Sequence, residues 1–84
     1  HFRLLTSQGP NVEGGKLDYR EDGKLTRGFA LVAWPEAYGK SGVMTFLVNQ
    51  SGVVFEKDLG KKTSSVVGAM KAYDPDSSWK PTQP

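Results

Sequence analysis

Hydrolysis by paired carboxylates is the first chemistry that the residue spacing suggests. Glu56 and Asp58 are two positions apart on an expected strand, so both side chains lie on the same face of it. Two carboxylates on one face can serve as the acid and the base or nucleophile of a hydrolase. Lys57 and Lys61 are nearby, and an ion network on the protein surface is therefore the favoured interpretation.

A second acidic pair, Asp74 and Asp76, has the spacing of the first ligands in a calcium-binding loop. The central glycine and the closing glutamate of such a loop are missing, so the oxygen cage would be incomplete. An Asp-Pro helix stop followed by a solvated turn is the favoured interpretation. We predict no metal site and no cofactor, and Asp74 and Asp76 are the only metal candidates.

The sequence gives little support for a nucleophilic catalytic site or a phosphate-binding loop. A Ser-His-Asp arrangement needs a histidine held in place, and the single histidine is His1. The glycine-rich stretch at residues 9–16 ends in a lysine, but Leu17 stands where a phosphate-binding loop requires serine or threonine. We therefore name no catalytic residue, and a non-enzymatic role is favoured over an enzymatic one.

The composition restricts the chain to one small domain. Its 84 residues include 11 lysines and arginines, 9 aspartates and glutamates and no cysteine, so disulfides and thiolate metal sites are excluded. The basic residues do not cluster or alternate with aromatic residues, which argues against nucleic-acid binding. No stretch approaches the roughly 18 apolar residues of a membrane span.

Four short segments with strand character predict an antiparallel sheet, and they lie at roughly 2–6, 28–34, 43–49 and 53–57. The segment at 28–34 is a continuous apolar run, which is typical of a strand covered on both faces, and the segment at 43–49 is expected to be a second central strand. A turn at residues 49–52 makes the last two strands a hairpin. The Asp22-Gly23 pair predicts a smaller hairpin near 16–26.

One C-terminal helix is expected at about 63–73, on one face of the sheet. Apolar residues recur there at three- and four-residue spacing: Val66, Val67, Met70 and Tyr73. Thr63 is placed to cap its start, and an extended tail over 75–84 follows. The fold class is therefore α+β, a single domain over residues 1–84 with a two-layer architecture.

The candidate interface begins at the first predicted strand. Phe2 and Leu4 lie on that strand, and an open strand edge needs covering. Trp34, Tyr38 and Trp79 could extend the patch, although filling the core is the favoured role for part of the aromatic set. Because the strand starts without a lead-in, we expect the chain to be a fragment of a longer precursor. Its partner would be the rest of that precursor or another chain, a second copy included.

Several longer motifs resemble a known family: Gly28 to Pro35, Tyr38-Gly39, Ser41 to Asn49, Gly52 to Gly60 and Tyr73 to Trp79. The chain resembles the C-terminal portion of an uncharacterised bacterial exported-protein family, domain of unknown function twenty-nine fifty. The resemblance implies a longer precursor with a signal peptide and a secreted or periplasmic location, but no activity. A weaker similarity is to the C-terminal sheets of type IV pilins and pseudopilins, whose apolar N-terminal helix is absent here.

We thus expect a non-enzymatic secreted or cell-envelope module that works through protein contacts. The alternative is a part of a carboxylate-based hydrolase whose site is completed by an N-terminal segment.

Overall fold

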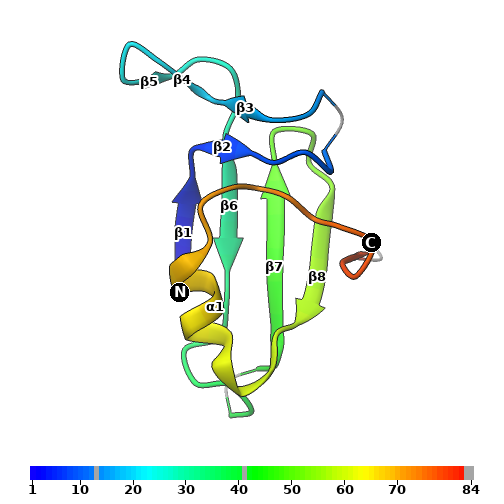
Figure 1. The fold of residues 1–84 in the computed structure, drawn as a ribbon. Coiled ribbons are helices and arrows are strands. Elements are labelled where there is room, and N and C mark those ends of the chain that lie inside the picture. The colour runs from blue at the N-terminus through cyan, green and yellow to red at the C-terminus, as the bar shows by residue number, and fades with distance from the viewer. Residues whose placement is uncertain (13, 41, 83–84) are drawn as a thin grey trace.

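The computed structural model describes residues 1–12, 14–40 and 42–82. An antiparallel sheet carries a short helix and the C-terminal segment on one side (Figure 1). Across this sheet the strands are β1 (Phe2–Leu5), β6 (Ala30–Ala33), β7 (Met44–Asn49), β8 (Val54–Asp58) and β9 (Lys80–Pro81). Two small pairs accompany it: β2 (Ser7–Gln8) with β3 (Leu17–Asp18), and β4 (Arg20–Glu21) with β5 (Lys24–Leu25). The α+β class and the antiparallel sheet are confirmed.

The four predicted strands are present, and a fifth was missed. β9 is two residues long and contains Pro81, which removes one backbone donor and is tolerated at a sheet edge. Next to it, the backbone N–H of Thr82 donates to the Val54 carbonyl at 2.7 Å. The sheet therefore has five strands where about four were expected. Residues 83–84 of the predicted tail lie outside the described residues.

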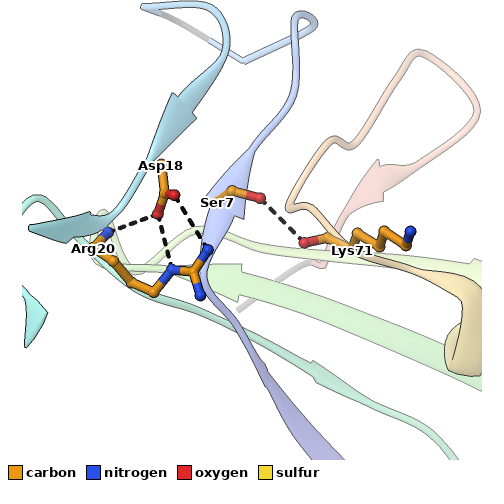
Figure 2. A network of polar contacts seen from close by, with 4 residues as sticks. All are labelled: Ser7, Asp18, Arg20 and Lys71. Carbon is orange, nitrogen blue, oxygen red and sulfur yellow. Dashed lines mark hydrogen bonds and ion pairs between the residues drawn. The ribbon is translucent and has the colours of Figure 1, made fainter. Parts of the chain in front are cut away.

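The predicted small hairpin is shorter than expected and divided. Asp22 and Gly23 both have positive φ, 53° and 81°, as a tight two-residue turn between β4 and β5 requires. The preceding residues pair elsewhere, because β3 joins β2 with Ser7 opposite Asp18. Figure 2 shows the Ser7 hydroxyl donating to the Lys71 carbonyl, so β2 also meets the C-terminal segment.

The helix α1 (Thr63–Ala69) follows a 3₁₀ turn, η1 (Gly60–Lys62), and is shorter than the predicted 63–73. Met70 is already extended, and the Arg3 guanidinium on β1 donates to the carbonyls of Val67 and Met70. Tyr73 instead pairs with the segment around β2, where its N–H donates to the Ser7 carbonyl. The expected helix was too long because contacts from distant residues end it.

Thr63 is the first helical residue, whereas we expected it to be the cap. Its hydroxyl donates to the Gly60 carbonyl at 2.5 Å, which joins α1 to the 3₁₀ turn before it.

The core lies between one face of the sheet and the elements that cross it. It contains Leu5, Tyr19, Ala30, Val32, Leu47, Val67, Tyr73 and Trp79. Val67 comes from α1, while Tyr73 and Trp79 come from the segment that follows the helix and crosses the sheet (Figure 1). Full burial of each large apolar side chain stabilises the fold by about 1.5–3 kcal/mol. Among the described residues, no helix has the length and apolarity needed to cross a bilayer.

Candidate functional site

The face of the sheet opposite the core is apolar and uncovered, and we call it the open face. Side chains alternate along each strand, so the strand register assigns residues to this face in rows. One row holds Leu4, Leu31, Val48 and Val54, and the next holds Phe2, Ala33, Phe46 and Glu56. Phe2 is 76% exposed and Phe46 is 38% exposed. Leu4 is 45% exposed, whereas the side chains between these strand ends are partly buried: Leu31, Ala33, Val48, Val54 and Glu56.

This composition is unusual for a sheet that has one face in water. Antiparallel sheets of that kind normally carry polar side chains on the wet face. Here β1, β6 and β7 supply only apolar side chains to both rows. The strands β1, β6 and β7, about 4.8 Å apart and about five residues long, cover roughly 240 Å² in projection. That area is somewhat smaller than the roughly 300–600 Å² of the largest patches on monomers, which are often functional.

An apolar hollow of about 470 Å³ lies at one end of the open face. Ala33, Met44 and Phe46 line it from β6 and β7, and Trp34 and Val43 line it from the adjoining loop ends. The His1 ring lies against the Trp34 ring, with centroids 5.6 Å apart. The hollow can therefore accept a large apolar or aromatic side chain.

The β8 margin of the open face is acidic and adjoins the hollow, because Glu56 pairs with Phe46 and Asp58 pairs with Met44. Glu56 and Asp58 alternate along this strand and share the open face, as the spacing predicted. The Tyr38 hydroxyl donates to Asp58 Oδ1 at 2.7 Å, and the Gly60 N–H donates to the same oxygen at 2.9 Å. These bonds, the tyrosine one first, hold the pKa of Asp58 below its ordinary value. Asp58 therefore favours its charged form. A charged carboxylate is better suited to the rim of a binding surface than to the role of a proton donor.

The other two candidate carboxylates accept hydrogen bonds from within the domain, Asp74 from a residue distant in the sequence and Asp76 from a near neighbour. Asp74 accepts hydrogen bonds from the backbone N–H and the side-chain amide of Asn11, at 2.9 and 3.2 Å. Asp76 accepts from the Ser78 N–H at 2.8 Å and from the Ser78 hydroxyl. Over residues 1–12, 14–40 and 42–82, no three histidine, cysteine or acidic side chains lie close enough to hold a metal.

Residues 1–82 match a family described as Protein of unknown function (DUF2950). The chain belongs to this DUF2950 family. No curated protein and no solved structure matches the chain. The similarity to pilin sheets stays a prediction from the sequence.

The predicted interface residues of this DUF2950 chain lie in four different settings. Phe2 and Leu4 are exposed on the open face, whereas Trp34 is partly buried, packs against the core and also lines the hollow. Tyr38 is half-buried at the acidic margin, bonded to Asp58. Trp79 is only 9% exposed and belongs to the domain's own core, which leaves it little surface for a partner.

The sequence prediction missed the centre of the face. Leu31, Met44, Phe46 and Val48 were not singled out, although they stand in the apolar runs of β6 and β7. The available signal was the expectation that the strand at 28–34 is covered on both faces. Since the described chain covers only one face, the other becomes the candidate site.

Proposed function

We propose that this chain is a non-enzymatic protein-interaction module that binds a polypeptide segment through the open face. The observation that carries the proposal is the apolar composition of that face on β1, β6 and β7. The occupant would be the remainder of a longer precursor or another chain. Its chemistry would be apolar at the centre, with basic or polar groups toward Glu56 and Asp58.

The size of the face sets what the binding can achieve. Burying roughly 240 Å² of apolar surface contributes about 6 kcal/mol before any costs. Association costs an estimated 4–15 kcal/mol, so a flat contact of this size alone gives weak binding. A partner side chain that fills the hollow would bury additional area and lose its contact with water. This supports the hollow as the centre of the contact.

Photo-crosslinking in the cells that produce the protein tests this proposal. A benzophenone-bearing residue replaces Phe46 on the open face, and in a matched control it replaces Leu25, which is also 38% exposed but lies on β5. We expect a covalent protein adduct at position 46 and little or none at position 25. Equal adduct yields at both positions, or none at position 46, would exclude the open face as a binding surface.

A hydrolase role is the competing proposal. Glu56 and Asp58 line a cavity of about 590 Å³ together with Lys57 and Lys80, which supports some ligand access there. A carboxylate pair needs one member kept protonated as the general acid, and the hydrogen bonds to Asp58 favour its charged form. The binding proposal therefore has the stronger support.

We further propose a secreted or periplasmic location, which the resemblance to exported proteins supports. Fractionation of the producing cells, with the protein followed by antibody, tests the location. Recovery of the protein in the cytoplasmic fraction alone would exclude it.

A further inference from the structure

We infer that an uncharged cavity at one end of the sheet is a binding site for a neutral saccharide. The cavity has a volume of about 420 Å³. Pockets for small molecules usually have volumes of about 300–1,000 Å³. It lies where the turn between β7 and β8, the loop after β2 and the segment after α1 come together (Figure 1).

This cavity is separate from the open face. Val48 and Val54 belong to the open face, so their sequence neighbours Asn49 and Phe55 lie on the core side of the sheet. Both of these neighbours line the cavity. The inference is therefore independent of the proposed function, and either can fail without the other.

The described residues that line the cavity carry no charge. Their polar side chains are mostly amides: Gln8, Asn11, Asn49 and Gln50. Valine side chains and the Phe55 ring supply apolar surface beside them. A phosphate, carboxylate or amine would lose hydration here without meeting an opposite charge, which is unfavourable. A neutral ligand avoids that cost.

Asn49 has two hydrogen-bond donors that the fold does not use. The Ser51 N–H donates to Asn49 Oδ1 at 3.0 Å, and the Ser51 hydroxyl donates to the same oxygen at 2.5 Å. Since a backbone N–H only donates, the atom that faces it is the amide oxygen. The two N–H groups on Nδ2 have no partner among the described residues, although Asn49 is only 9% exposed.

The Tyr73 hydroxyl is a second unused group on the cavity wall. The backbone of this residue is fixed on both sides, because its N–H donates to the Ser7 carbonyl at 2.8 Å and its carbonyl accepts from the Gly9 N–H at 3.0 Å. The residue is 3% exposed, and its hydroxyl makes no hydrogen bond within the described chain.

Both groups are open to the cavity. The unpaired side-chain atoms that are sealed from solvent, among the described residues, belong to Arg3, Thr45 and Thr82. Asn49 Nδ2 and the Tyr73 hydroxyl therefore keep contact with solvent, and their residues line the cavity. Buried polar groups are normally paired, so two unpaired donors on one wall point to a ligand that accepts hydrogen bonds.

A saccharide fits this combination of groups. Several hydroxyl oxygens stand close together on a sugar ring, and each can accept a hydrogen bond. The apolar face of the ring suits the Phe55 side chain, because ligand pockets usually combine apolar walls with a few polar groups. An uncharged peptide is the competing ligand, but it offers only one carbonyl acceptor per residue.

Amide NMR titration of the full chain tests the inference. The probes are methyl glucoside, methyl galactoside and N-acetylglucosamine, with glucuronate as the charged counterpart and N-acetylglycinamide as the peptide analogue. At least one neutral sugar should cause saturable shifts in the amides of residues 11–12 and 49–53, with a dissociation constant in the millimolar range. Glucuronate and the peptide analogue should cause none.

Tyr73→Phe removes only the unpaired hydroxyl and should weaken sugar binding about two- to tenfold without loss of folding. Asn49→Asp keeps the oxygen that Ser51 contacts and removes both donors, so it should weaken binding as well. Thr26→Val is the control, because it removes an exposed hydroxyl that bonds Glu21 beside β5, and it should bind as wild type. The same spectra show whether each variant is folded, and Tyr73→Phe alone decides if Asn49→Asp is not.

The absence of saturable shifts with all three sugars would overturn the site. Shifts with the peptide analogue alone, or equal affinity for glucuronate, would overturn the neutral saccharide as its ligand. Unchanged sugar affinity in a folded Tyr73→Phe protein would show that binding occurs elsewhere.

Discussion

The contact between Tyr38 and Asp58 is the clearest electrostatic feature at the scale of single residues. The tyrosine hydroxyl donates to the carboxylate at 2.7 Å, which lowers the pKa of Asp58 and raises that of Tyr38. Both effects have the same largest cause, since the bond favours the ionised carboxylate and the protonated phenol. The contact also ties the loop after β6 to the end of β8.

Replacing Tyr38 with phenylalanine should raise the pKa of Asp58 toward the ordinary value of about 3.9. The rise should be incomplete, because the Gly60 N–H still donates to the same carboxylate. A carboxylate with a lowered folded pKa stabilises the fold above the unfolded pKa, and this stabilisation is lost as the pH falls through the folded pKa. The stability difference between wild type and Tyr38→Phe should therefore be constant above about pH 5 and shrink in more acidic solution.

Carboxyl-carbon NMR titration measures this effect. Asp76, whose pKa is lowered by hydrogen bonds from Ser78, serves as the internal control and should titrate identically in both proteins. An unchanged Asp58 titration in Tyr38→Phe would show that the tyrosine bond is not formed in solution.

At the scale of secondary-structure elements, the sequence was informative where local pattern decides the structure. The apolar runs of β6 and β7 and the turn before β8 could be predicted, because such runs and turns are specified by neighbouring residues. The end of α1 could not, since it depends on Arg3, more than sixty residues away in the chain.

The local sequence pattern also could not predict the strand β9 or which face of the sheet is left uncovered. β9 has two residues, one of them proline, and carries no strand signal of its own. Both faces of β6 are apolar, so the sequence indicates that each face of this strand needs a cover. It does not indicate which of the two covers is supplied by residues 1–82. The candidate site could therefore be anticipated only at its margins, through Phe2, Leu4, Trp34 and Tyr38.

Arg3→Met should destabilise the fold by removing the donor to the helix carbonyls of Val67 and Met70. A charged donor to a carbonyl contributes up to about 3 kcal/mol, but Arg3 Nε is buried without a partner among the described residues, which offsets part of the gain. We expect a loss of about 1–2 kcal/mol in the free energy of unfolding.

Urea denaturation followed by circular dichroism measures the loss, with Arg20→Met as the matched control. Arg20 bonds Asp18 on the surface, with both side chains about half exposed, so its loss should cost less than about 0.5 kcal/mol (Figure 2). Equal effects of the two substitutions would show that Arg3 does not hold the helix.

The whole molecule has a stable centre and a projecting periphery. β6 and β7 lie inside the sheet with strands on both sides, and they carry the buried Val32 and Leu47. The β4–β5 hairpin projects beyond the end of the sheet, and all of its strand residues are exposed (Figure 1). Local opening should therefore require far less free energy in the hairpin than in the centre.

Amide hydrogen exchange should follow this arrangement. The slowest exchange is expected in β6 and β7 and should approach the global free energy of unfolding, whereas β4 and β5 should exchange at least about a hundredfold faster. NMR-detected exchange resolves the individual amides. Similar protection in the hairpin and the centre would indicate that the hairpin is held by contacts that this structure lacks.

The positions of the two tryptophans give the molecule a built-in optical probe. Trp79 is enclosed in the core, so its emission should report only on unfolding. Trp34 stands in the hollow against the His1 ring, where its emission should shift to shorter wavelength when the hollow fills. With Trp79 replaced by phenylalanine, the fluorescence of the remaining indole would follow docking directly, without any attached label.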